Sequence, residues 1–272
     1  MSDTPTLRIG SLETHVVDRG TGAPVLLLHG SGPGVSAEAN WRLTMPALIE
    51  AGHRVVAPDL IGFGRTVPPA GHVYDLRSWI DHVVAVMDAT GLERTAVVGN
   101  SFGGALALRL AIEHPHRIDR LVLMGSAGVR FPLTSGLDAV WGYRPGVQVM
   151  RRVLEAFVHD HAMITDDLAQ MRYAASVEDG ADLRFAAMFP EPRQRWIDAL
   201  ASDDDELRTI TAPALIVHGR EDRVIPTSTS QTLFELIPDA QLHVFGQCGH
   251  WSQIEKAAEF NALLTSFLGP PV

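Results

Sequence analysis

Short apolar runs rich in Val, Ile and Leu recur along this chain, and stretches with helical spacing separate them. The runs are continuous rather than alternating, which is typical of strands buried on both faces of a parallel sheet. Helical spacing of apolar residues occupies intervals such as 75–90 and 102–114. This alternation predicts an α/β protein with an open, mostly parallel sheet flanked by helices. The predicted strands include 25–28, 55–57, 96–98, 121–124, 215–217 and 242–245.

The alternation stops between about residues 131 and 205, where we expect several helices and no strand. This segment is rich in Met, Phe and Trp, and so many large apolar side chains must cover something. We predict a helical lid over 131–205, inserted after the sixth strand, and an α/β core over 1–130 and 206–272. An ordinary helical layer of the core is the alternative.

Charge and composition narrow the choice of partners. The formal net charge of −10 disfavours nucleic acid, whose phosphates require a basic face, but it allows a small anionic substrate that needs only one local cation. The single Cys248 permits no internal disulfide, and the chain shows neither a secretory pattern nor an apolar run of membrane-spanning length. We therefore expect a cytoplasmic protein without membrane association.

The segment GNSFGG at 99–104 follows one predicted strand and precedes a predicted helix. It fits the G-x-S-x-G pattern, in which the glycines permit a sharp turn that exposes the serine at the end of the strand. The helix that follows points its amino terminus toward any developing anion. Ser101 is therefore the candidate nucleophile, and a small residue in a tight turn is the plainer interpretation.

A serine hydroxyl needs a base to accept its proton, and that base needs an orienting acid. Among the twelve histidines, His250 follows the last predicted strand and so lies at the same sheet edge as Ser101. Asp222 follows the strand at 215–217 and reaches that edge too, with Glu221 as its nearest rival. The chain order Ser101, Asp222, His250 is the order found in α/β-hydrolases.

An oxyanion must also be held by amide donors. The Phe102 amide is one candidate, and the other lies in the loop 29–34 after the first predicted strand. The glycines of this loop lack the spacing of a dinucleotide-binding loop, and Pro33 removes an amide donor. His159 and His161 could together hold a metal ion, but no candidate for a third metal ligand is evident in the sequence. We therefore predict no cofactor and no metal.

Five segments resemble the meta-cleavage-product hydrolases, which are carbon–carbon bond hydrolases of the α/β-hydrolase fold. The similarity runs from about residue 25 to 267 and includes lid residues that other α/β-hydrolases do not share. The segments are HGSGPGVSAEANWR (29–42), GNSFGGALAL (99–108), MGSAGVRFPLT (124–134), HGREDRVIP (218–226) and FGQCGHWSQ (245–253).

The resemblance implies roles for individual residues. Ser101, Asp222 and His250 match the catalytic positions, and the amides of Ser31 or Gly32 and of Phe102 match the oxyanion hole. The positions that contact the dienoate part of the substrate in the family are matched by Asn40, Asn100, Arg172 and Trp251.

The implied reaction is hydrolysis of 2-hydroxy-6-oxo-hexa-2,4-dienoates such as 2-hydroxymuconic semialdehyde, the meta-cleavage products of catechols. Its products are 2-hydroxypenta-2,4-dienoate and a small acid, in aromatic-compound degradation. Trp141 is expected to bind substrate by filling the space that a phenyl substituent would need. Family habit suggests a homo-oligomer.

Two other functions compete with this reading. A carboxylesterase or thioesterase on the same fold explains the triad but leaves Arg172, Asn40 and Asn100 without a role. A non-catalytic ligand receptor has no need of an intact Ser101, Asp222 and His250 together.

Overall fold

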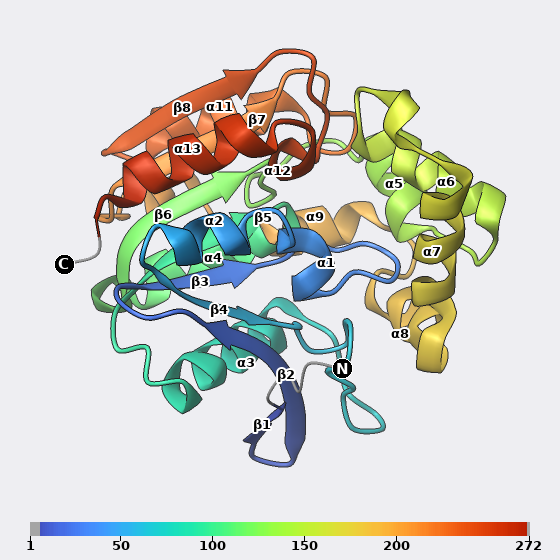
Figure 1. The fold of residues 1–272 in the computed structure, drawn as a ribbon, viewed down its shortest axis with the longest axis horizontal. Coiled ribbons are helices and arrows are strands. Elements are labelled where there is room, and N and C mark those ends of the chain that lie inside the picture. Colours follow the sequence, from blue (N-terminus) through green and yellow to red (C-terminus); the bar gives the residue numbers. More distant parts are fainter. Residues whose placement is uncertain (1–5, 271–272) are drawn as a thin grey trace.

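The computed structural model describes residues 6–270, whose strands form a single eight-stranded sheet covered by helices (Figure 1). The strands are β1 (Thr6–Ile9), β2 (Leu12–Arg19), β3 (Pro24–Leu28), β4 (Arg54–Pro58), β5 (Thr95–Asn100), β6 (Ile118–Met124), β7 (Ala214–Gly219) and β8 (Ala240–Phe245).

The strand order is β1-β2-β4-β3-β5-β6-β7-β8. All pairs from β4 to β8 are parallel, whereas β2 is antiparallel to both of its neighbours. The prediction of a mostly parallel sheet flanked by helices is therefore confirmed. Because parallel strands place their carboxyl ends at one edge, the loops after β3, β5, β7 and β8 emerge together.

The helices of the core lie on both faces of the sheet (Figure 1). On one face lie α1, α2 and α13, and on the other lie α3, α4 and α11. Their bounds, with those of the short helices beside them, are α1 (Ala37–Trp41), α2 (Met45–Glu50), α3 (Leu76–Ala89), α4 (Phe102–Glu113), η1 (Pro115–Arg117), α11 (Thr227–Leu236), α12 (Ser252–Glu255) and α13 (Ala257–Leu268).

The two faces explain the continuous apolar runs of the sequence. Successive side chains of a strand point to opposite sides, so a strand covered on both sides needs an apolar residue at every position. In β3, Leu26 and Leu28 pack with α3 and α4, whereas Val25 and Leu27 pack with α1, α2 and α13.

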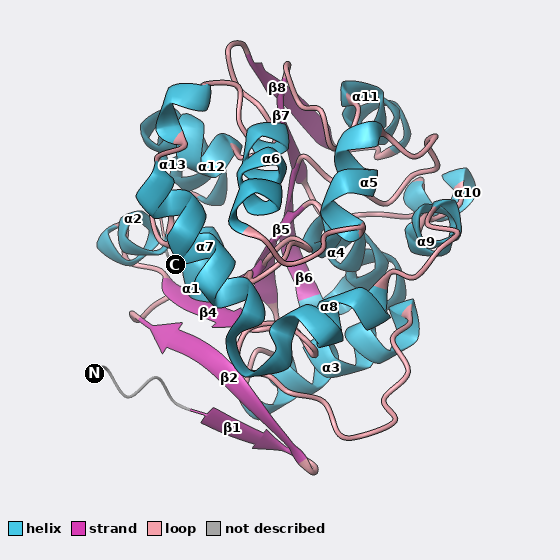
Figure 2. Ribbon diagram, turned by 90° about the vertical axis from the view of Figure 1, so that its right-hand side faces the viewer, coloured by secondary structure: helices cyan, strands magenta, loops and turns pink. Residues whose placement is uncertain are grey.

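The segment between β6 and β7 is helical, and Figure 2 shows α5 to α8 in front of the edge where the parallel strands end. Its apolar side chains join the same core cluster as α3 and α4, so this layer packs as part of the molecule. The bounds 131 and 205 of a separate lid domain stay a prediction. The helices are α5 (Ser135–Trp141), α6 (Val147–Phe157), η2 (His161–Met163), α7 (Asp166–Val177), η3 (Glu178–Gly180), α8 (Ala181–Met188), α9 (Gln194–Leu200) and α10 (Asp204–Leu207).

Three strands depart from the expectation of burial on both faces. The expected buried run at 242–245 lies in β8, which is an edge strand, and Val244 is 45% exposed there. The hairpin of β1 and β2 was not predicted, because neither strand is a continuous apolar run. These strands lie at the two ends of the sheet, where β1 and β8 are the edge strands and β2 lies next to β1.

The side chain of Trp79 generates a prediction about stability. It is 1% exposed, stacks on Phe189 at 6.0 Å, meets Phe102 edge-on at 4.8 Å and donates from Nε1 to the carbonyl of Ile61 at 3.2 Å. We expect Trp79→Ala to lower the free energy of unfolding by about 3–5 kcal/mol, because it empties a packed site and leaves a carbonyl unpaired.

Urea denaturation followed by circular dichroism measures this change. Phe234→Ala is the control, because Phe234 is 44% exposed and its loss should cost about 0.5 kcal/mol or less. Equal losses in the two variants would contradict the role given to Trp79.

Candidate active site

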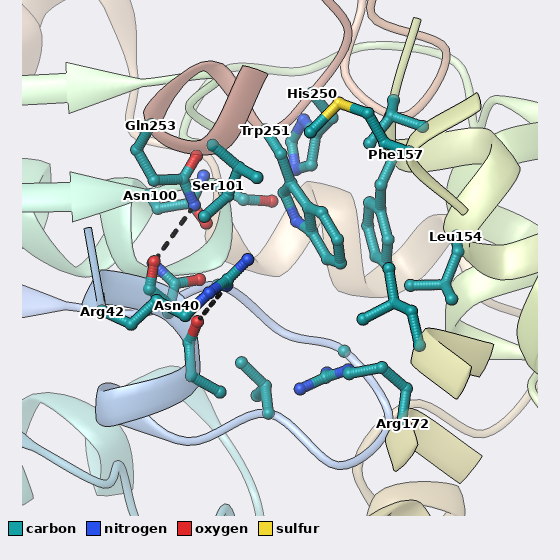
Figure 3. Close-up of a pocket in the computed structure, with 18 of the residues that line it drawn as sticks. Asn40, Arg42, Asn100, Ser101, Leu154, Phe157, Arg172, His250, Trp251 and Gln253 are labelled. Atoms are coloured by element: carbon teal, nitrogen blue, oxygen red, sulfur yellow. Dashed lines mark hydrogen bonds between the residues drawn. The ribbon is translucent and has the colours of Figure 1, made fainter. Parts of the chain in front are cut away.

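A cavity of about 140 Å³ lies where the loops after β3, β5 and β8 face α6 and α7 (Figure 3). This volume is comparable with the roughly 150 Å³ cavity that accepts benzene in an engineered protein core. The cavity can therefore hold a molecule of about six carbons. The predicted residues that line it are Ser31, Gly32, Asn40, Asn100, Ser101, Arg172, His250 and Trp251.

Ser101 stands in the turn between β5 and α4 with φ 55° and ψ −115°. A non-glycine residue rarely adopts positive φ, and such strain persists only where the surroundings impose it. Here the Ser101 amide donates to the carbonyl of Met124 at 2.9 Å, and its carbonyl accepts from the Gly104 amide at 2.9 Å. The turn holds the hydroxyl at the cavity wall.

The two glycines that flank Ser101 are required by close backbone approaches. A Cβ on Gly99 would lie 2.6 Å from Cα of Gly104, and a Cβ on Gly103 would lie 2.6 Å from the carbonyl oxygen of His29. Neither neighbour is a flexible side-chain end, so the G-x-S-x-G spacing is a steric requirement of this strand-to-helix turn.

His250 and Asp222 meet at the same edge. Nδ1 of His250 lies 2.6 Å from Oδ2 of Asp222, and both side chains are buried. The other carboxylate oxygen accepts from the amides of Val224 at 2.7 Å and Ile225 at 3.0 Å. Glu221, the nearest rival, instead accepts from the amide of Cys248.

The environment of Asp222 favours its carboxylate form. Burial alone raises the pKa of such a group, but the facing His250 and a second histidine, His218, outweigh burial and hold the pKa of Asp222 well below its usual range. Asp222 is thus a charged partner for an imidazole that accepts a proton.

Ser101 and His250 line the cavity together. In residues 6–270, no hydrogen bond joins the Ser101 hydroxyl to the His250 imidazole, whose Nδ1 faces Asp222. Phe157 of α6 stacks on His250 with ring centroids 5.7 Å apart and on Trp251 at 4.5 Å. The helical layer therefore touches the His250 ring directly.

The loop after β3 supplies amides beside Ser101. Its geometry is set by buried His29, whose Nε2 accepts from the Leu60 amide at 3.0 Å, so that its Nδ1–H donates to the carbonyl of Gly30 at 2.8 Å. Burial lowers the pKa of His29, which keeps the ring neutral, as this pattern requires. In the described part of the chain, the amides of Ser31 and Gly32 have no acceptor.

Phe102 is the first residue of α4, and its side chain is buried away from the cavity. The first amides of a helix have no partner within the helix, so its N–H is free to meet an anion beside Ser101. The amides of Ser31, Gly32 and Phe102 can form an oxyanion hole in this arrangement.

Trp141 does not line the cavity, contrary to its expected place against the substrate. Its ring stacks on Phe189 at 4.4 Å, and its Nε1 donates to the hydroxyl of Ser31 at 2.9 Å. The indole fills the space behind the oxyanion loop and supports that loop from α5.

Two guanidinium groups converge on the cavity, from Arg172 in α7 and from Arg42 next to α1 (Figure 3). Thr165 caps the amino terminus of α7, where its hydroxyl accepts from the Leu168 amide. The residue at which α7 begins determines which face of the helix carries Arg172. Arg172 donates to the carbonyl of Pro33 at 3.2 Å, while its buried Nε has no partner.

In the described residues, no carboxylate forms an ion pair with Arg42 or Arg172. Burial, together with the nearby charge of Arg42 and against the opposing effect of Tyr143, lowers the pKa of Arg172 to about 10. A guanidinium without a counter-ion in such a place is stabilised by a bound anion. Arg42 was not predicted from the sequence, although it follows Asn40 by two residues.

Amide groups complete the cavity wall. Asn100 donates to the carbonyl of Met124 at 3.3 Å, which leaves its Oδ1 beside Gly30. The Nδ2 of Asn40 is buried without a partner, and Gln253, which the sequence analysis also missed, donates to the Asn40 carbonyl at 3.4 Å (Figure 3). Because buried polar groups are normally hydrogen-bonded, the unpaired amide group of Asn40 is suited to bind a polar ligand.

Residues 6–270 hold no group of three or more His, Cys, Asp or Glu side chains that could bind a metal ion. Within the same range, no helix combines the length and the apolar character needed to cross a membrane.

The chain is similar to known proteins over most of its length. A family model described as the alpha/beta hydrolase fold matches residues 23–257. The chain is 55% identical to 2-hydroxymuconate semialdehyde hydrolase of Pseudomonas sp. strain CF600, over 94% of this chain and 90% of that protein. It is also 55% identical to 2-hydroxy-6-oxo-2,4-heptadienoate hydrolase of Pseudomonas putida strain F1, over 95% of this chain and 94% of that protein.

The chain is also similar to a solved structure. The structure of a meta-cleavage product hydrolase from Pseudomonas fluorescens IP01, a serine-to-alanine variant complexed with acetates, superposes with a TM-score of 0.96 and 52% identity over 97% of each chain.

The lowered pKa of Asp222 leads to a prediction about acid stability. A carboxylate whose pKa falls on folding stabilises the protein above the pKa of the unfolded chain, and this stabilisation is lost as the pH falls through the folded value. We expect the difference in Tm between the wild type and Asp222→Asn to be largest near neutral pH and to shrink below about pH 4.

Thermal melts across the acid range measure this difference. Asp239→Asn serves as control, because Asp239 is exposed and forms no ion pair in the described structure. A gap that stays constant down to acid pH would count against the ionised state of Asp222.

Proposed function

Because the chain belongs to the α/β-hydrolase family, and within it to the meta-cleavage-product hydrolases, we propose that it hydrolyses a carbon–carbon bond in 2-hydroxymuconic semialdehyde or a related 2-hydroxy-6-oxo-hexa-2,4-dienoate. The products are 2-hydroxypenta-2,4-dienoate and a small carboxylic acid, in the degradation of aromatic compounds. The observation that carries this proposal is one cavity that contains both the Ser101 hydroxyl and arginines without counter-ions.

Binding follows from the charges of the cavity wall. The substrate carries a carboxylate and a 2-hydroxy group at one end, and Arg172 offers this end a charge-assisted hydrogen bond. Asn40 and Asn100 offer amide groups to the enol oxygen. Trp251, stacked on Phe157, forms an apolar wall that keeps the conjugated chain in one plane and excludes water.

The first stage converts the dienol to its keto form. A proton leaves the 2-hydroxy group and a proton is added at C5, the carbon next to the bond that breaks. His250 is the one imidazole among the described residues that line the cavity, and we assign it the exchange of this proton.

The second stage breaks the bond between C5 and C6. His250 accepts the proton of Ser101 as Oγ attacks C6, and the amides of Ser31, Gly32 and Phe102 hold the oxygen that becomes negative. The electron pair of the breaking bond passes to the dienoate, which takes its proton from His250. Water then hydrolyses the acyl group from Ser101 and releases the small acid.

Loss of Ser101 tests the nucleophile. The yellow ring-fission product of catechol is added to purified protein, and the loss of its dienolate absorbance is followed. We expect rapid loss with the wild type and a fall in kcat by several orders of magnitude, up to roughly 10⁶-fold, in Ser101→Ala. A modest effect would contradict attack by Ser101.

The same preparation separates carbon–carbon cleavage from simple ester hydrolysis. We expect the wild type to prefer the ring-fission product to a simple aryl ester. No loss of dienolate absorbance together with fast ester hydrolysis would identify an esterase, and binding of both compounds without turnover of either would identify a receptor.

Replacement of Arg172 tests the anion site. We expect Arg172→Gln to raise KM by about 10-fold to 100-fold, the equivalent of one lost charge-assisted hydrogen bond, and Arg172→Lys to recover part of the loss. Steady-state kinetics on the ring-fission product measures KM. Arg152→Gln, in the exposed part of α6, is the matched control and should leave KM unchanged; equal KM values in Arg172→Gln and the wild type would refute the site.

The cytoplasmic location and the homo-oligomer stay predictions. Trp141 is now assigned to the support of Ser31 rather than to direct contact with substrate. The large Trp141 side chain occupies space behind the loop after β3 that a bulky acyl group would need. This agrees with a preference for small acyl groups.

A further inference from the structure

A second histidine contacts the carboxylate that faces His250. Nε2 of His218 lies 3.1 Å from Oδ2 of Asp222, the same oxygen that lies 2.6 Å from Nδ1 of His250. We infer that His218 is a positioning residue, which fixes the Asp222 carboxylate and limits the negative charge that it presents to His250. This inference rests on the proposed function of Asp222 and His250 and deepens it.

The hydrogen-bond partners define the tautomer of His218. Its Nε2 faces two oxygens that can only accept, the carbonyl of Ile225 at 3.1 Å and the carboxylate of Asp222. Nε2 must therefore carry the hydrogen. Nδ1 is then free to accept from the hydroxyl of Ser230, which lies 2.6 Å away.

A strand and a helix hold His218 and its partner Ser230. His218 lies in β7, paired with Val244 of β8, and Ser230 lies in α11. The side chains of His218 and Asp222 are fully buried, and Ser230 is 1% exposed. A buried imidazole with both nitrogens paired cannot rotate without breaking two hydrogen bonds. The contact with Asp222 is thus set by the sheet and by α11.

Asp222 has all of its acceptor positions occupied by this arrangement. Oδ1 accepts from the amides of Val224 and Ile225, and Oδ2 faces the two imidazoles. A carboxylate offers about four such positions, so the group has no freedom to turn away from His250. Asp222 is therefore held by two backbone amides and two imidazoles.

The contact also has an electrostatic effect on His250. A donor on Oδ2 withdraws negative charge from the oxygen that stabilises protonated His250. The titratable groups that act on Asp222 are His218 from β7 and His250 from the loop after β8. Burial raises the pKa of nearby Cys248, and the charge of Asp222 adds to this rise. Removal of the His218 donor leaves more charge facing His250, and the protonated form of His250 becomes more stable.

The test compares three variants by the pH dependence of kcat/KM on the ring-fission product. His218→Leu removes the donor, and His218→Gln keeps an amide donor near the Nε2 position and an acceptor for Ser230. His53→Leu is the matched control, because His53 is also a buried histidine but contacts the carbonyl of Ala23 away from the cavity.

We expect the acid limb of the profile to move to higher pH by about half a unit to one unit in His218→Leu, the size expected for one lost hydrogen bond. The value of kcat at pH 7 should fall about tenfold while KM stays within about twofold, because the cavity wall is unchanged. His218→Gln should restore most of both values, and His53→Leu should shift neither, whatever its effect on Tm.

Other outcomes overturn the inference. An acid limb that does not move in His218→Leu, or a loss that His218→Gln does not rescue, would reduce His218 to a structural residue. If His218→Leu does not fold, Ser230→Ala carries the test, because it removes the donor that orients the imidazole and should move the acid limb the same way. An unmoved limb in a folded Ser230→Ala would then refute the inference.

Failure of the proposed function gives a different result. If the wild type does not cleave the ring-fission product, the proposed substrate is wrong, and the same profiles are measured with a simple aryl ester. A shift in His218→Leu on that ester would support the positioning role alone, and its absence would refute it.

Discussion

The carbonyl of Met124, at the end of β6, holds the site together. It accepts from the strained amide of Ser101 at 2.9 Å and from the side chain of Asn100 at 3.3 Å. One oxygen thus fixes the turn that exposes the hydroxyl and the amide group beside it. The start of α4 follows directly from this turn, so the position of the Phe102 amide depends on the pairing of β5 with β6.

The residues predicted well from the sequence are those whose constraint is local. The turn at Ser101 needs glycines at fixed spacing, and the central strands need an apolar residue at every position, so both leave a plain pattern. Asp222 and His250 were predicted because each directly follows a strand of the parallel sheet. The edge strands β1 and β8, and β2 next to β1, lack this pattern, because part of each strand is not buried.

Contacts between distant segments could not be predicted in the same way. Arg42 at the end of α1 and Gln253 in the short helix α12 join the cavity through tertiary packing, and no sequence pattern marks them. Trp141 was placed against the substrate because of its size, whereas its indole N–H finds an acceptor in Ser31, 110 positions away. The role of His218 is visible only once β7 and α11 are packed, since its Ser230 contact crosses between them.

The hydrogen bond between Trp141 and Ser31 ties substrate range to rate. A smaller side chain at position 141 would open space for a bulkier acyl group, but it would also remove the hydrogen bond that supports the loop after β3, to which we assign the developing oxyanion. Evolution toward larger substrates in this scaffold therefore has to repair the oxyanion loop at the same time. A single substitution that enlarges this space would widen the range of acyl groups accepted but lower the turnover rate. A second change near Ser31 would be needed to restore the rate while keeping the wider range.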